Sequence, residues 1–175
     1  SGTVTAIGAV AGAVYMTGGT FTHTSNIGGN VYLNGSSTFS SGRSVEKAIY
    51  MNGGTLSLTT TTESSLVGGV GRLDGTGGGA INKTGSGTTY IYSNEVTSTF
   101  TGVTSVQAGQ VYLANGVTLG TGVSSVYVNG GTFGTVAAGA TVGGDLYVAG
   151  GTVGGPLAVT GEVYMTSGTF ASTGA

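Results

Sequence analysis

The chain has 175 residues, of which 38 are glycine and only 6% are charged, and its formal net charge is −2. Four basic residues cannot neutralise a row of phosphates, which excludes nucleic-acid binding, and the lack of cysteine with a single histidine excludes thiol catalysis and ordinary zinc sites. A hydrophobic fraction of 38% argues against disorder, and no apolar run is long enough for a membrane span. We expect one ordered domain over residues 1–175, without a cofactor.

One short motif recurs along the chain: an aliphatic residue, tyrosine, another residue, a glycine-containing corner, then an apolar residue that usually follows threonine. In chain order it reads VYMTGGTF at 14–21, VYLNGSSTF at 31–39, IYMNGGTL at 49–56, VYLANGVTL at 111–119, VYVNGGTF at 126–133, LYVAGGTV at 146–153 and VYMTSGTF at 163–170. An eighth unit, IYSNEVTSTF at 91–100, has no glycine and fits with a longer insertion. The degenerate stretch Leu66–Leu73 takes the place of one unit that lacks its tyrosine. This period is too short for repeats built from helix pairs.

Each unit alternates with period two, which is typical of a β-strand. Val14 and Met16 then face the core while Tyr15 faces outward, and the glycines supply the corner conformations. Val, Thr, Tyr and Phe favour strands. The sequence therefore predicts an all-β parallel β-solenoid (β-helix) of about nine coils, each with about 15–21 residues.

If every unit occupies the same place in its coil, the tyrosines form one outward stripe along the rod. An amphipathic stripe of that kind marks either ladder packing alone or a contact surface, and both readings stay open. Its members are Tyr15, Tyr32, Tyr50, Tyr92, Tyr112, Tyr127, Tyr147 and Tyr164. A second outward line is expected from the threonines that follow the corners, namely Thr20, Thr55, Thr132, Thr152 and Thr169.

The end coils are expected to pair with another copy of the chain, because no charged or helical cap is evident at either end. Such head-to-tail contacts produce an open filament when they do not close. The residues expected at this pairing are Val4, Ala6, Val163, Met165 and Phe170.

Residues Gly78–Leu113 resemble the autotransporter-associated β-strand repeat of bacterial surface proteins. The matching positions are Ile81, Lys83, Thr84, Gly85, Gly87, Thr88, Asn94, Phe100, Thr101, Gly102, Val106, Gly109 and Val111. The resemblance covers about a fifth of the chain and implies a right-handed parallel β-helix that is secreted and displayed at a bacterial cell surface. The outer-membrane barrel of that family has no counterpart in this sequence.

Few residues are candidates for chemistry. The acids Glu46, Glu63, Asp74, Glu95, Asp145 and Glu162 are expected on different coils and at different phases of the repeat, which disfavours an enzyme. Arg43, Glu46 and Lys47 are expected in a solvated loop, with a polar binding loop as the alternative. Arg72 and Asp74 are expected at a structural corner, and His23 at the surface.

The sequence therefore predicts a non-enzymatic, self-associating structural protein, a subunit of a surface filament, sheath or adhesive stalk. Its partners would be other copies of itself. The alternative is a β-helix that binds or cleaves a surface polysaccharide, with the Arg43–Lys47 loop and Glu95 as the contacts. A further alternative is ice binding through the threonine line.

Overall fold

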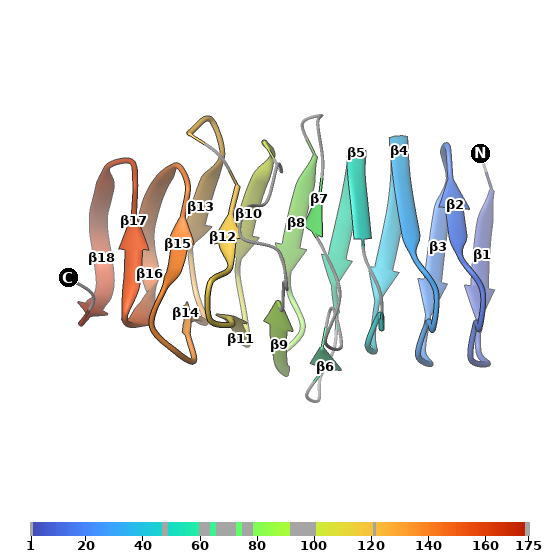
Figure 1. The fold of residues 1–175 in the computed structure, drawn as a ribbon, viewed down its shortest axis with the longest axis horizontal. Helices are drawn as coiled ribbons and strands as arrows, with labels where there is room; N and C mark the ends of the chain where they lie inside the picture. The colour runs from blue at the N-terminus through green and yellow to red at the C-terminus, as the bar shows by residue number, and fades with distance from the viewer. Residues whose placement is uncertain are drawn as a thin grey trace.

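A computed structural model describes residues 2–46, 49–59, 64–65, 73–74, 79–91, 101–120 and 122–173. The described residues form a β-solenoid without a helix, and the strand pairings between them are parallel. Figure 1 shows the coils stacked along one axis, with the two termini at opposite ends of the rod. The predicted parallel solenoid is confirmed, but the expected nine coils are not, because the stack makes about seven turns.

Each coil has three sides, which we call A, B and C after the order in which the chain visits them. Side A contains β1 (Thr3–Ala6), β3 (Thr20–His23), the second halves of β4 (Val31–Ser41) and β5 (Ile49–Leu58), β8 (Ala80–Lys83), β10 (Val103–Val106), β13 (Ser125–Val128), and the first halves of β16 (Asp145–Gly155) and β18 (Val163–Ser172).

Side B follows side A in the chain. It contains β6 (Ser64–Ser65), β9 (Thr88–Ile91), β11 (Gln110–Leu113), β14 (Thr132–Thr135) and the second halves of β16 and β18. In the N-terminal coils the same place in chain order is taken by single bridges that join Val10, Ile27 and Val45.

Side C completes the turn and consists of two separate ladders. The first contains β2 (Val14–Met16), the first halves of β4 and β5, and β7 (Leu73–Asp74). The second contains β12 (Thr118–Leu119), β15 (Ala140–Val142) and β17 (Leu157–Val159).

The core is a narrow column of apolar side chains from all three sides. The expected alternation is found in the strands: in β13, for example, Val126 and Val128 are buried while Ser125 and Tyr127 are partly exposed. Val14 and Met16 face inward as predicted. Because each strand stacks on a strand of the same phase, one apolar residue at each inward position is enough to continue the core.

The recurring motif changes sides along the rod. In the N-terminal coils its tyrosine half lies on side C and its Thr-Phe half on side A, as in β4. In the C-terminal coils the tyrosine half lies on side A and the Thr-Phe half on side B, as in β13 and β14. The motif determines strand and corner geometry but not which side of the coil each half occupies.

Candidate functional site

The described tyrosines form three stacks on three different sides. On side C, Tyr32 stacks between Tyr15 and Tyr50, with ring centroids 4.5 and 4.8 Å apart. On side B, Tyr90 stacks on Tyr112 at 5.9 Å. On side A, three more tyrosines stack at 4.6 and 4.8 Å: Tyr127, Tyr147 and Tyr164.

The single tyrosine stripe expected from the sequence is therefore wrong. The neighbour of Tyr112 on the next coil is Gly134, not Tyr127. Asp74 occupies the position beside Tyr50 where the stripe would continue. Tyr92 lies outside the described residues. The stripe breaks because the tyrosine half of the motif moves from side C to side B and then to side A, which periodicity along the chain does not reveal.

Two of the terminal rings are strongly exposed. Tyr15, at the N-terminal end of its stack, is 73% exposed, and Tyr164, at the C-terminal end of another, is 45% exposed. Rings inside a stack have both faces covered by neighbours and present only their edges to solvent. Contact with a further aromatic or apolar group is therefore concentrated at the ends of the stacks.

Two carboxylates flank the side-A stack. The Tyr164 hydroxyl donates to Glu162 Oε2, and the resulting hydrogen bond and negative charge raise the pKa of Tyr164 to about 12. Asp145 accepts a hydrogen bond from the Glu162 backbone N–H at 2.9 Å. Burial of Tyr147, followed by the charge of Asp145, raises the pKa of that phenol.

The prediction that the acids lie at different phases of the repeat is wrong for Asp145 and Glu162, although the two lie on different coils as expected. Leu146 pairs with Val163, which places Asp145 and Glu162 at the same phase on adjacent coils. The Asp145 carboxylate accepts a hydrogen bond from the next coil, and the Glu162 carboxylate accepts one from the Tyr164 hydroxyl. These contacts give both carboxylates a structural role on side A.

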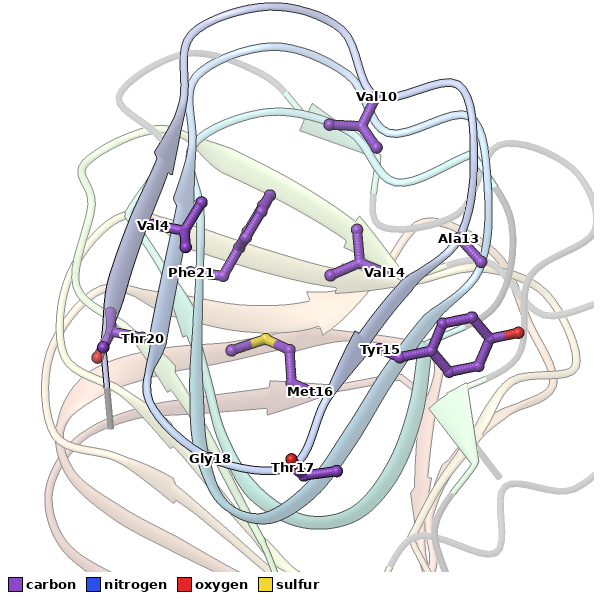
Figure 2. A pocket seen from close by; sticks show the side chains of 11 residues that line it. Val4, Val10, Ala13, Val14, Tyr15, Met16, Thr17, Gly18, Thr20 and Phe21 are labelled. Atoms are coloured by element: carbon purple, nitrogen blue, oxygen red, sulfur yellow. The ribbon is translucent and has the colours of Figure 1, made fainter.

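The first described coil is covered on one face only. A hollow of about 530 Å³ lies inside the first coil, and Figure 2 shows five side chains turned into it, namely Val4, Val10, Val14, Met16 and Phe21. Tyr15 points away from it. Val4 is 57% exposed although it occupies an inward position, because no further coil of the described chain covers it.

The C-terminal coil presents the opposite edge. The inward-phase residues Val163, Met165 and Phe170 are 43%, 52% and 37% exposed. Their counterparts one coil earlier, Leu146, Val148 and Val153, are at most 1% exposed because β18 covers them. With partly buried Ala6, the residues proposed for end pairing thus lie at the two open edges.

His23 is buried, not at the surface as expected. It continues the inward phase of Phe21, is 1% exposed and stacks on Phe39 with ring centroids 5.0 Å apart. Its Nδ1 contacts the Ser25 carbonyl oxygen. Burial lowers the pKa of His23, and the hydrogen bond to Ser25 opposes this in part.

Lys83 is a buried cation that was not predicted from the sequence. Its side chain is 0% exposed, its Nζ donates to the Gly85 carbonyl oxygen, and burial lowers its pKa to about 8. Gly109 packs so closely that a Cβ there would lie 2.8 Å from Nζ. The alternation from buried Ile81 was the signal for the inward position of Lys83.

The threonine line also divides between two sides. Thr132, Thr152 and Thr169 stack on side B. On side A, four coils form two adjacent outward rows of hydroxyls, one of threonines and one mixed. The rows are Thr3, Thr20, Thr38, Thr55 and Thr5, Thr22, Ser40, Ser57.

The remaining polar candidates are only partly described. Arg43 and Glu46 are exposed on either side of buried Val45, as expected of a solvated corner. Lys47, Glu63, Arg72 and Glu95 lie outside the described residues, and of Asp74 only the backbone is described. No three His, Cys, Asp or Glu side chains within the described ranges lie where they could share a metal ion.

No protein-family model, curated protein or solved structure matches the chain. The resemblance to the autotransporter-associated repeat therefore remains a prediction from the sequence. The described part of the chain contains no helix long and apolar enough to cross a membrane.

Proposed function

We propose that this protein is a non-enzymatic structural subunit that polymerises end to end into a filament, sheath or adhesive stalk at a bacterial cell surface. Its partners are other copies of itself, without a cofactor. The solenoid is right-handed in this proposal, because crossover connections between parallel strands are right-handed in about 98% of cases. The secreted location rests on the resemblance of Gly78–Leu113 to the surface-protein repeat.

The observation that carries the proposal is that the first and the last described coil each leave one edge uncovered. Each edge exposes apolar side chains of inward phase together with a parallel strand whose outer backbone groups are available for pairing. Exposed strand edges are templates for adding another strand. Stacking one edge on the other continues the same type of ladder that already joins β16 to β18.

The test is polymerisation of the purified chain, followed by sedimentation and negative-stain electron microscopy. Rods of many subunits are expected, and Val4→Lys or Met165→Lys should abolish them because each places a charge in an edge that must become buried. Val103→Lys is the matched control, since Val103 is 42% exposed on the outward side of β10 in the middle of the rod. Particles that stay monomeric at high concentration would contradict the proposal.

A second candidate, ice binding, is favoured by the two hydroxyl rows on side A. Parallel strands repeat at about 4.8 Å, and alternate residues of one strand are about 6.6 Å apart, so the rows form a regular grid of hydroxyl and methyl groups. Such a grid resembles the oxygen spacing of an ice face. The described residues give a polysaccharide partner no comparable support.

A thermal-hysteresis measurement tests this second candidate. Hysteresis is expected for the native chain and should be lost in Thr20→Lys, which disrupts the side-A grid. Thr152→Lys, on side B, is the control that should retain it. Equal activity of the two variants, or none in the native chain, would reject this function.

A further inference from the structure

The four Asn-Gly pairs of the sequence lie at different places in the coils. An asparagine that precedes glycine can lose its side-chain amide without a catalyst, because glycine has no Cβ to hinder the approach of its nitrogen to the asparagine Cγ. The reaction requires a glycine N–H that is not already bonded and a side-chain amide that can turn toward it. The pairs are Asn34-Gly35, Asn52-Gly53, Asn115-Gly116 and Asn129-Gly130.

Two of the pairs lie within strands and are held by the side-C ladder. Asn34 of β4 is in register with Asn52 of β5, and Gly35 is in register with Gly53. The Asn34 Nδ2 donates to the Met16 carbonyl oxygen of the preceding coil at 3.2 Å, so this amide must break a hydrogen bond before it can turn. Negative charges at two stacked positions would also repel each other. Both strand pairs are therefore expected to react slowly.

The third pair, Asn129-Gly130, lies at a corner, but its glycine nitrogen is already bonded. Asn129 is exposed to solvent. The Gly130 N–H, however, donates to the Val106 carbonyl oxygen of the neighbouring coil at 3.2 Å. An attack by the Gly130 nitrogen would first have to break this bond between the coils.

The fourth pair, Asn115-Gly116, meets both requirements. It forms the middle of the turn between β11 and β12, which the Val117 N–H closes by donating to the Ala114 carbonyl oxygen at 3.2 Å (Figure 1). A turn that is closed in this way leaves its central peptide out of the hydrogen bond. Among the described residues the Gly116 nitrogen makes no backbone hydrogen bond, and Asn115 is exposed.

The neighbouring corner leaves space for the reaction. A Cβ on Gly139 would lie 3.0 Å from Asn115 Oδ1 and 3.6 Å from the Gly116 nitrogen, so the amide and the nitrogen face the same glycine. Gly139 has no side chain that could cover either group. A Cβ added at Gly116 would meet no atom of the described chain within 4 Å, so the corner also has room for the additional backbone methylene of an isoaspartate.

We propose that Asn115 is a site of spontaneous deamidation, which converts it to aspartate or isoaspartate while the solenoid stays folded. The Gly116 nitrogen attacks Asn115 Cγ and forms a C–N bond, and the side-chain nitrogen leaves as ammonia with the proton that Gly116 loses. Water then opens the cyclic imide at one of its two carbonyls. One water is consumed and one ammonia is released, without an oxidant or a cofactor. The product carries one more negative charge than the native chain, whose net charge is −2.

Peptide mapping by mass spectrometry tests this site in the purified chain. The protein is incubated in mildly alkaline buffer made with heavy-oxygen water, and circular dichroism verifies that it stays folded. Asn115 should incorporate heavy oxygen about tenfold faster than Asn129, the matched exposed pair, because ring closure at Asn129 must first break one hydrogen bond. In denaturant the two rates should become equal, since the hydrogen bond of Gly130 is then absent.

Asn115→Gln provides the second measurement, because glutamine would have to close a larger ring. This variant should lose the fast product and keep the slow ones. Equal rates at Asn115 and Asn129 in the folded chain, or a ratio that denaturant does not change, would overturn the proposal. A folded chain in which Asn115 stays unmodified, under conditions where the denatured chain reacts, would overturn it as well.

Discussion

At the scale of single residues, the two buried ionisable side chains are the unusual feature of this nearly uncharged protein. His23 and Lys83 both occupy inward positions on side A, at the ends of β3 and β8. Burial disfavours the charged form of each, which lowers both pKa values. Because the two groups titrate in different pH ranges, each makes its own contribution to the pH dependence of stability.

We expect acid to destabilise the N-terminal coils through His23. The folded pKa lies below the usual 6.5, so the unfolded chain takes up the proton first, and stability falls as the pH drops through 6.5. The melting temperature should decrease between about pH 7 and pH 5 in the native chain and decrease less in His23→Phe, which keeps an aromatic ring against Phe39. An equal decrease in both would show that His23 is not responsible.

The pH dependence of stability in the alkaline range tests the contribution of Lys83. With a folded pKa of about 8 and an ordinary value of 10.5, the unfolded chain binds the proton more tightly, so the free energy of unfolding should rise between these pH values. Lys83→Met should remove this rise, and His23→Phe should retain it. Denaturant titrations at a series of pH values below 10 measure the effect, and an unchanged rise in Lys83→Met would contradict it.

At the scale of the structural element, the corners restrict the sequence more than the strands do. Gly109 has φ +65°, and a Cβ there would lie 2.3 Å from the Gly85 carbonyl oxygen of the neighbouring coil. Gly116 has a similar φ of +74°, but a Cβ added there would meet no atom within 4 Å. A comparison of the two glycines therefore distinguishes the cost of backbone strain, which both share, from the cost of close packing between coils, which only Gly109 has.

Gly109→Ala should consequently cost more stability than Gly116→Ala. Both substitutions carry the strain of a positive φ, about 1 kcal/mol. Only Gly109→Ala also forces two corners apart, which should add on the order of 2 kcal/mol to the loss. The free energies of unfolding from denaturant titrations provide the comparison, and equal losses would mean that the coils shift apart at little cost.

At the scale of the whole molecule, the low charge determines how assembly should respond to salt. The open edges carry apolar side chains and backbone groups, and the net charge of the chain is −2. Interactions of this kind are screened little by salt, whereas ion pairs weaken strongly when the Debye length shrinks. The assembly mechanism is therefore predicted to be apolar and backbone-mediated.

Light scattering during polymerisation tests this prediction. The rate and extent of assembly should not decrease when sodium chloride is raised from about 0.02 to about 0.5 M, since no attraction between opposite charges is being screened. Val103→Lys serves as a charged control with intact edges. A strong loss of assembly at high salt would indicate ion pairs between the stacked copies.

The repeat motif was enough to predict the parallel solenoid, the inward and outward alternation and the glycine corners. These are local properties, and a repeated unit such as VYMTGGTF contains all of them. The alternation also indicates that His23 and Lys83 point inward, because each follows a core residue by two positions. Alternation is reliable at such positions even when the residue is polar.

Which units lie above one another is apparent only from the folded chain. The tyrosine half of the motif lies on side C in β5, on side B in β11 and on side A in β13, and this divides the tyrosines into three stacks and the threonines into two sets of rows. The side that a strand occupies depends on the summed length of all the segments before it. A repeat motif does not record that sum, because its corners tolerate insertions without any change in the strands they connect.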